Sequence, residues 1–282
     1  MVLNRGAMMV TLIIGKNSNL SQELFKAIPD CVLLSSRELS SNMDLLAPYQ
    51  TEKINLIFNN FQTAVGLNDV SHVDQYIESA LGITAKILAY FQDTEIHKII
   101  YTSSSSVYGN NIFCSENDPL IPLSLHASLK VSNEKLIQAY CQNRNIDCSI
   151  ARIFNMYGGA DNFSVIGKII RAFQNDEELT IINNGNAIRD FIHINDVVHT
   201  YTKLLAMQSV PVINVGSGKG TSIKSILEFL KNHRILLKTQ TLQRDELKTS
   251  TANNALMIAL LGSTAFKGVE TYLLDQLTKS SS

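Results

Sequence analysis

Short apolar runs alternate with amphipathic stretches through the first half of the chain. The apolar runs are rich in β-branched residues and lie at 9–15, 31–36, 54–60, 98–104 and 148–154. Apolar residues recur every three or four positions, as in helices packed on one side, at 20–28, 73–92 and 126–144. Parallel strands need long crossovers, so continuous apolar strands separated by helices predict a sheet covered on both faces. The expected fold class is α/β, with a doubly wound parallel sheet.

Beyond residue 155 the elements become shorter and less regular. They include "VIGKIIRAFQ", "LTIIN", "DVVHTYTKLLAM" and "SIKSILEFL". No repeat or low-complexity tract interrupts them. We expect one domain over 8–155 and a smaller carboxyl-terminal lobe over 156–282, with some elements of the lobe returning to the sheet.

The charge balance argues against two classes of partner. The 282 residues carry a formal net charge of −1, with 45% hydrophobic and 17% charged residues. Such a composition gives ample core and no basic surface for nucleic acid or an anionic membrane. No apolar run reaches the roughly 18 residues of a membrane-spanning helix, and the apolar start is too short for a secretory signal. Neither nucleic acid nor a membrane is an expected partner.

The cysteines offer no sign of metal or redox chemistry. Cys31, Cys114, Cys141 and Cys148 form no CxxC pair, and no cysteine–histidine cluster has the spacing of a metal site. We therefore expect no metal, and idle thiols in a reducing, cytoplasmic compartment.

The loop after the first predicted strand, "GKNSNLSQEL", has the spacing of a phosphate-binding turn. A GxxGxxG pattern would place small residues at Gly15, Ser18 and Ser21. Glycine there lets the backbone approach a pyrophosphate at the amino terminus of a helix, and serine can donate a hydrogen bond to phosphate. A strand-to-helix turn with a serine cap explains the same residues equally well.

The end of the second predicted strand, "LLSSREL", carries a basic residue where a ribose 2′-hydroxyl would call for an acidic one. Arg37, preceded by Ser35 and Ser36, suits a 2′-phosphate because guanidinium pairs with phosphate through two hydrogen bonds. The alternative is a solvated arginine that follows a strand.

Five motifs occur in a fixed order along the chain. They are "KIIYTSSSSVYG", "SLHASLKVSNEKLI", "ARIFNMYGG", "NGNAIRDFIHINDVV" and "INVGSGKGTSIKSI". Together they resemble the extended short-chain dehydrogenase/reductase family, in its group of nucleotide-sugar epimerases, dehydratases and 4-ketoreductases. The resemblance implies a Rossmann-type, dinucleotide-binding first domain and a nucleotide-sugar-binding lobe. It also implies an NAD(P)-dependent 4-ketoreductase or epimerase of surface polysaccharide or deoxysugar synthesis, using NADP, with NAD also possible.

The resemblance assigns roles to particular residues. Ser104 matches the hydroxyl that binds the reacting oxygen of the substrate, and Lys130 the lysine of the YxxxK helix. Asn155 and Arg189 match residues that hold the sugar or its diphosphate. The implied cofactor-binding residues are Gly15, Lys16, Ser18, Leu20, Arg37 and Lys130.

The chain departs from the family at the position of the catalytic tyrosine. His126 stands there, one helical turn before Lys130. Next to a lysine a positive histidine is disfavoured, so we expect a neutral imidazole at pH 7 that is a poor acid but can act as a base or hydrogen-bond donor. Leu129, where the family often has a serine, and Phe61, where it usually has small residues, are further departures.

Two functions remain open on this basis. The first is an NADP-dependent enzyme with Ser104, His126 and Lys130 as its catalytic residues. The second is a catalytically weak or silent relative that binds a nucleotide sugar or a dinucleotide. In either case we expect a homodimer formed by the helices at 73–92 and 126–144, with Ile83, Ile87 and Ile137 in the interface.

Overall fold

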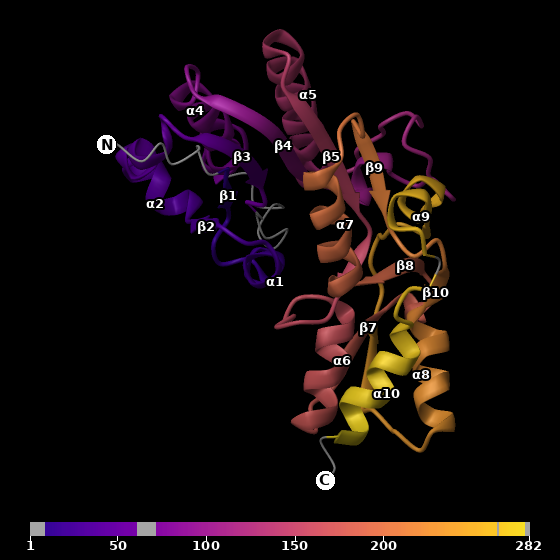
Figure 1. Cartoon of the computed structure of the whole chain (residues 1–282). Helices are drawn as coiled ribbons and strands as arrows, with labels where there is room; N and C mark the ends of the chain where they lie inside the picture. The colour runs from indigo at the N-terminus through magenta and orange to yellow at the C-terminus, as the bar shows by residue number, and fades with distance from the viewer. Residues whose placement is uncertain (1–8, 61–71, 264, 280–282) are drawn as a thin grey trace. The chain divides into compact units, whose positions relative to one another are not determined.

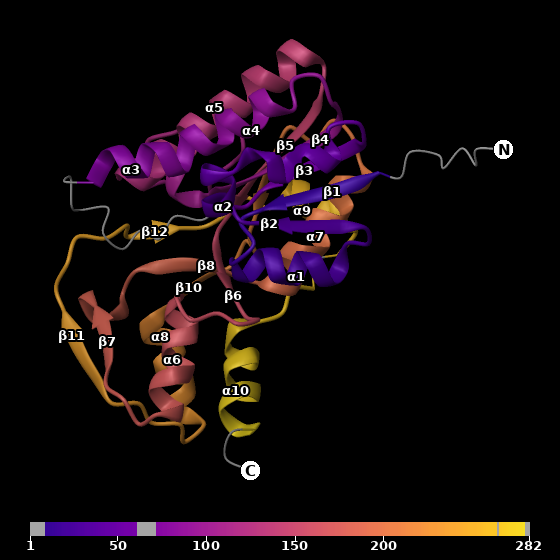
Figure 2. The same ribbon diagram turned by 90° about the vertical axis from the view of Figure 1, so that its left-hand side faces the viewer.

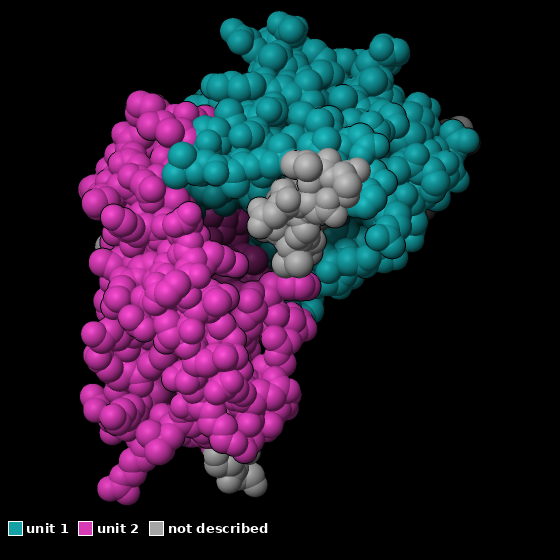
Figure 3. Space-filling model, turned by 180° about the vertical axis from the view of Figure 1, so that it is seen from behind, with its two compact units in different colours: residues 1–107, 122–152, 201–213 teal, residues 108–121, 153–200, 214–282 magenta. Residues whose placement is uncertain are grey.

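The computed structural model describes residues 9–60, 72–263 and 265–279. The chain divides into two compact units, each assembled from several segments (Figure 3). Unit 1 comprises residues 1–107, 122–152 and 201–213, and unit 2 comprises residues 108–121, 153–200 and 214–282.

A six-stranded sheet organises unit 1 (Figure 1). Its strands are β1 (Val10–Ile14), β2 (Cys31–Leu34), β3 (Lys53–Phe58), β4 (Glu95–Ser104), β5 (Asp147–Ile153) and β9 (Val212–Val215). They lie in the order β2-β1-β3-β4-β5-β9, and β1 pairs in parallel with both β2 and β3. The order reverses direction at β1 and β3, and ligands of doubly wound sheets bind at such a point.

Helices cover both faces of this sheet. They are α1 (Asn19–Ala27), α2 (Ser36–Ser41), the 3-10 turn η1 (Met43–Tyr49), α3 (Val73–Ile77), the π turn η3 (Glu78–Gly82), α4 (Ile83–Tyr90) and α5 (Leu125–Arg144). Figure 2 shows α4 and α5 side by side on one face and α1 on the other. The Tyr140 hydroxyl joins the two neighbours by donating to the Leu88 carbonyl at 3.0 Å.

The core of unit 1 contains the three isoleucines that we expected in a dimer interface. Ile83, Ile87 and Ile137 are at most 1% exposed and pack in the cluster formed with the sheet. The expectation that they form an interface with a second copy is therefore wrong. These side chains are covered by the chain's own β strands and helices.

Unit 2 is built around β8 (Ile188–His193). It pairs with β10 (Gly220–Ser222), β12 (Thr249–Ser250) and β6 (Asn155–Tyr157), and a separate ladder joins β7 (Leu179–Ile182) to β11 (Thr239–Leu242). The short 3-10 turn η4 (Ser105–Tyr108) leads the chain from unit 1 into unit 2, and another, η5 (Asn183–Gly185), follows β7. The helices are α6 (Val165–Gln174), α7 (Ile194–Ala206), α8 (Ile223–Asn232), α9 (Ala255–Leu261) and α10 (Val269–Lys279). The apolar faces of α6, α8 and α10 form the second core, and α7 carries the chain from unit 2 into unit 1.

None of the helices within the described residues is long and apolar enough to cross a membrane.

Candidate functional site

The point where the strand order reverses brings the first loop against the end of β3. Gly15 follows β1 with φ at +112°, a conformation that favours glycine. A Cβ atom on Gly15 would lie 2.2 Å from the Asn59 carbonyl oxygen, so a larger residue cannot fit. Gly15 also donates to the Leu34 carbonyl at 2.8 Å, which ties the loop to β2. The glycine is required by this close approach of backbones.

The two serines of the loop face inward. Asn59 donates from Nδ2 to the Ser18 and Ser21 hydroxyls at 2.7 and 2.8 Å. The Ser18 hydroxyl also caps α1 by accepting from the Ser21 N–H at 3.0 Å, and donates to the Ser21 hydroxyl at 2.9 Å. Ser18 is therefore engaged by its own loop, and a phosphate at this turn has to be held by backbone N–H groups at the start of α1.

The remaining residues expected around a dinucleotide differ in how exposed they are. Lys16 is exposed beside it, whereas the Leu20 side chain is fully buried and offers a ligand only its backbone. Arg37 is exposed in the first turn of α2, after β2. Phe61 lies outside the described residues.

Helix α5 begins with a cap and is tied to the end of β4. Ser124 accepts from the Ala127 N–H at 3.2 Å, which starts the helix two residues before His126. Lys130 donates from Nζ to the Thr102 carbonyl oxygen at 2.8 Å. One turn further, Glu134 pairs with Arg152 of β5 through bonds of 3.1 and 2.8 Å and accepts from the Ser103 hydroxyl. The ammonium group of Lys130 is thus bonded to Thr102, which lies two residues before Ser104 on β4.

His126 and Lys130 border a small hollow inside unit 1. Tyr101, Asn60 and Asn133 also line it. Burial lowers the pKa of His126 to about 4, and the nearby Lys130 ammonium adds to this effect. Burial also lowers the pKa of Lys130 to about 8, against the opposing effect of Glu134. At pH 7 the imidazole is neutral and most of the lysine is charged.

Two polar groups of this hollow were not singled out from the sequence. The buried amide oxygens of Asn60 and Asn133 accept no hydrogen bond from the described residues. Such acceptors call for a donor, either water or a ligand N–H or O–H group. Asn133 could have been found from its place three residues after Lys130 on the same helix face, whereas Asn60 carried no local signal.

Ser104 ends β4 with a half-buried hydroxyl. It accepts from the Ser106 N–H at 3.2 Å and from the Ser106 hydroxyl at 3.0 Å. An oxygen that accepts twice keeps its own hydrogen to donate. Tyr108, which could also have lined a site, is buried instead and donates to Asn214 Oδ1 at 2.7 Å.

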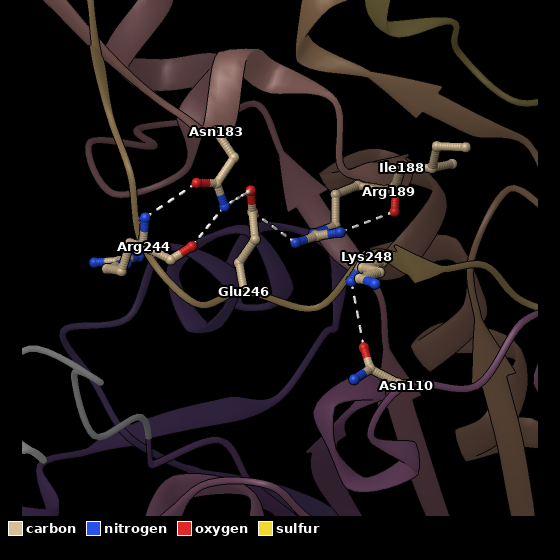
Figure 4. A network of polar contacts seen from close by, with 7 residues as sticks. All are labelled: Asn110, Asn183, Ile188, Arg189, Arg244, Glu246 and Lys248. Atoms are coloured by element: carbon tan, nitrogen blue, oxygen red, sulfur yellow. Dashed lines mark hydrogen bonds and ion pairs between the residues drawn. The ribbon is translucent and has the colours of Figure 1, made fainter.

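In unit 2, Arg189 lies in a network of polar side chains (Figure 4). It donates to Glu246 Oε2 at 2.9 Å and to the Ile188 carbonyl at 3.0 Å. Asn183 donates to the Glu246 carboxylate and to the Arg244 carbonyl. Glu246 was not expected from the sequence, because 57 residues separate it from Arg189.

The neighbour of Arg189 has a structural role. Asp190 is fully buried and accepts from the N–H groups of Ser217, Gly218 and Ala252 at 2.7, 2.9 and 3.1 Å. It fixes the "VGSG" turn, in which Gly218 has φ at +76°. Asn155 donates to the Asp190 carbonyl at 3.3 Å, so it lies along β8 in the same unit as Arg189.

The chain matches a known family over most of its length. The model of the NAD dependent epimerase/dehydratase family covers residues 15–216. The chain is 30% identical to Protein CapI of Staphylococcus aureus over 179 residues, which are 62% of this chain and 53% of that protein. It spans about half the length of the curated relatives it matches.

Several solved structures with the same fold contain a bound dinucleotide. UDP-glucuronic acid 4-epimerase from Bacillus cereus, in complex with UDP-glucuronic acid and NAD, has a TM-score of 0.84 at 21% identity and covers 97% of this chain and 99% of its own. RMD from Pseudomonas aeruginosa, complexed with NADPH, has a TM-score of 0.81 at 21% identity, with 96% and 98% covered. The likeness confirms the α/β class with a doubly wound sheet.

Proposed function

The chain belongs to the NAD dependent epimerase/dehydratase family, and on that premise we propose that it is an NAD(P)-dependent nucleotide-sugar 4-ketoreductase or epimerase. The observation that carries the proposal is the placing of His126 and Lys130 one turn apart on α5, with Lys130 anchored to the end of β4. Ser104, the third proposed catalytic residue, ends the same strand.

In this reaction the protein has to add a proton to the sugar oxygen, or remove one from it. A bound nicotinamide dinucleotide supplies or accepts the hydride at the sugar carbon. We assign the proton to His126, whose imidazole is neutral at pH 7 because its pKa is about 4. A neutral imidazole takes the hydroxyl proton as a base when the sugar is oxidised, and the imidazolium so formed returns it when the ketone is reduced again, as in an epimerisation. In a 4-keto reduction the small protonated fraction of His126 has to donate the proton, and water then reprotonates the imidazole.

Lys130 and Ser104 support this step. Below about pH 8 the Lys130 ammonium is charged and stabilises negative charge on the sugar oxygen. We also assign Lys130 to the ribose of the dinucleotide, on the strength of the resemblance of its helix to the family's YxxxK helix. Ser104 donates its remaining hydrogen to the reacting oxygen.

The dinucleotide belongs, on this proposal, at the reversal point of the sheet. The turn that Gly15 makes possible and the start of α1 suit a pyrophosphate. Lys16 is an exposed cation directly after that turn, Arg37 is an exposed cation after β2, the strand that pairs with β1, and Arg37 favours NADP over NAD. Ser18 shapes the loop through Asn59, and Leu20 contributes only its backbone.

We assign the nucleotide part of the substrate to Arg189 and Asn155. A diphosphate suits the planar fork of Arg189, which Glu246 now occupies with a single hydrogen bond. The diphosphate therefore has to compete with the Glu246 carboxylate for the guanidinium.

A second candidate is a silent binder of the same ligands. The pKa of His126 favours it, because at pH 7 roughly one imidazole in a thousand is protonated when the pKa is about 4. A reaction that needs an imidazolium donor would then be slow.

One experiment separates these functions. The full chain is titrated with NADPH and UDP by calorimetry and then assayed with NADPH and a 4-keto nucleotide sugar, and with UDP-sugars for epimerisation. We expect binding and turnover. Binding without turnover favours the silent binder, and absence of both bindings contradicts the proposal.

The setting and assembly are part of the proposal. We place the reaction in the synthesis of deoxysugars or surface polysaccharides, on the strength of the resemblance. We propose a homodimer whose interface uses surface residues, since Ile83, Ile87 and Ile137 are buried in the core. Sedimentation that shows only a 31.2 kDa species at micromolar concentration would contradict it.

A further inference from the structure

The polar side chains of the small hollow beside His126 come from three parts of unit 1. His126, Lys130 and Asn133 lie on one face of α5, since residues three and four apart on a helix are neighbours. Asn60 comes two residues after β3, and Tyr101 lies on β4. The hollow has room for about one water-sized sphere, with a volume of about 10 Å³. It is therefore too small for part of a substrate and suits a single water molecule.

The hydrogen bonds of Asn133 fix which end of its amide is left for another partner. Asn133 Nδ2 donates to the Ala80 carbonyl at 3.1 Å and to the Leu129 carbonyl, one turn earlier on α5, at 3.3 Å. Ala80 is in the π turn η3, where the regular helical pattern is interrupted. Turning the amide over would lose both bonds, so the nitrogen is committed to the two carbonyls and Oδ1 is the atom that remains.

Two buried amide oxygens of this hollow call for a donor. Asn133 is 2% exposed and Asn60 is 8% exposed, and the Oδ1 atom of each accepts no hydrogen bond from the residues that the structure describes. Buried polar atoms in proteins are almost always hydrogen-bonded, and a buried water typically makes about three bonds to such atoms. One water molecule has two hydrogens and can donate to both oxygens, after which its own oxygen can only accept.

We propose that the hollow binds one water molecule, which donates to Asn60 Oδ1 and Asn133 Oδ1 and accepts from a ring N–H of His126. The two asparagines are then positioning residues that select one tautomer of the imidazole. The ring nitrogen that faces the water carries the hydrogen, so the other ring nitrogen of the neutral imidazole is bare. The catalytic meaning of this arrangement rests on the proposed function, whereas the water and the tautomer do not.

A bare ring nitrogen makes His126 a base towards the sugar. It takes the proton of the sugar hydroxyl, and the electron pair of that O–H bond forms the carbonyl as hydride leaves the carbon for the dinucleotide. Burial lowers the pKa of His126 to about 4, which agrees with a ring that is neutral at pH 7 before this step. The arrangement therefore favours an epimerisation, which begins with this oxidation, over a 4-keto reduction, which needs a proton donor at the sugar oxygen.

The tautomer can be measured on the full chain without substrate. NMR of nitrogen-labelled histidine rings shows which ring nitrogen carries a hydrogen, and His126→Gln identifies the signals of His126. At pH 7 we expect one tautomer to dominate in the wild type. Asn60→Leu and Asn133→Leu remove one acceptor each at nearly constant volume, so each should lower the ratio of the two tautomers about fivefold, the effect of one hydrogen bond of about 1 kcal/mol.

Controls and a second measurement keep the test decisive. Asn143→Leu, the same substitution at an exposed position of α5, should keep the wild-type ratio. Asn60→Leu leaves both bonds of Asn133 Nδ2 in place, so it tests the water even if Asn133→Leu does not fold. A high-resolution crystal structure should show a water within hydrogen-bond distance of both amide oxygens.

Three results would overturn the proposal. They are a crystal structure without that water, a wild-type His126 ring that is protonated or an even mixture of tautomers, and a folded Asn60→Leu variant that keeps the wild-type ratio. Turnover is not part of these measurements. A chain that shows the water and the single tautomer but no activity would contradict the proposed function and leave this inference standing.

Discussion

Two arginine–glutamate pairs in this chain have the same chemistry in different settings. In unit 1, Arg152 and Glu134 are 5% and 0% exposed and share two hydrogen bonds, and the Ser103 hydroxyl also donates to Glu134. In unit 2, Arg189 and Glu246 are 17% and 21% exposed and share one bond of 2.9 Å. The first pair is sealed inside the unit, and the second has access to solvent.

The difference in burial gives the two ion pairs different roles: the buried pair holds two elements together, and the partly exposed pair can exchange a partner for a ligand. Removing one partner of a buried ion pair leaves an uncompensated charge, so Glu134 and Arg152 have to stay together and fix α5 against β5. A partly exposed pair gains little from its attraction and can exchange one partner at low cost. On our proposal Arg189 exchanges Glu246 for the diphosphate of a nucleotide sugar.

The largest expected effect concerns stability. Glu134→Ala should lower the free energy of unfolding by about 3–5 kcal/mol, because the buried guanidinium of Arg152 loses the carboxylate that neutralises its charge. Glu246→Ala should lower it by less than about 1 kcal/mol. Urea denaturation of both variants measures the two values, and similar losses would erase the distinction between them.

The next effect concerns ligand binding. Arg189→Ala should weaken UDP binding about 30-fold, or about 2 kcal/mol, because a charged hydrogen bond to the diphosphate is lost. Arg171→Ala is the matched control, since Arg171 is exposed on α6 and has no assigned role. Calorimetry that finds equal losses for the two variants would remove Arg189 from the site.

A third arginine extends the comparison to an exposed side chain. Arg37 makes no ion pair with a carboxylate in the part of the chain that is described. We expect NADPH to bind the wild type about tenfold more tightly than NADH, or about 1.4 kcal/mol. Arg37→Ala should abolish that preference, and equal affinities in the wild type would contradict the assignment.

The smallest effect tests competition at Arg189. Glu246→Gln keeps the shape of the side chain and removes its charge, so UDP should bind about threefold more tightly, or about 0.7 kcal/mol. Glu228→Gln, an exposed position on α8, is the control. Weaker binding by Glu246→Gln would mean that the carboxylate orients Arg189 and does not compete with the ligand.

Local signals in the sequence were sufficient for the fold and for the frame of α5. The alternation of strands and helices predicted the parallel sheet, and the spacing of His126 and Lys130 placed both on one helix face. Glu246 could not be predicted, because β12 brings it to Arg189 only in the folded unit. Ile83 and its neighbours were misassigned because an apolar stripe does not show whether it faces its own sheet or a second copy.

The central claim is that His126 does the work usually done by a tyrosine. The most direct measurement is kcat at pH 7 with NADPH and a 4-keto nucleotide sugar, for the wild type, His126→Ala and His126→Tyr. We predict a loss of about 100-fold for alanine and retained or higher turnover for tyrosine. His233→Ala, exposed at the end of α8, should match the wild type. Unchanged turnover in His126→Ala would contradict the account and assign the proton to another group.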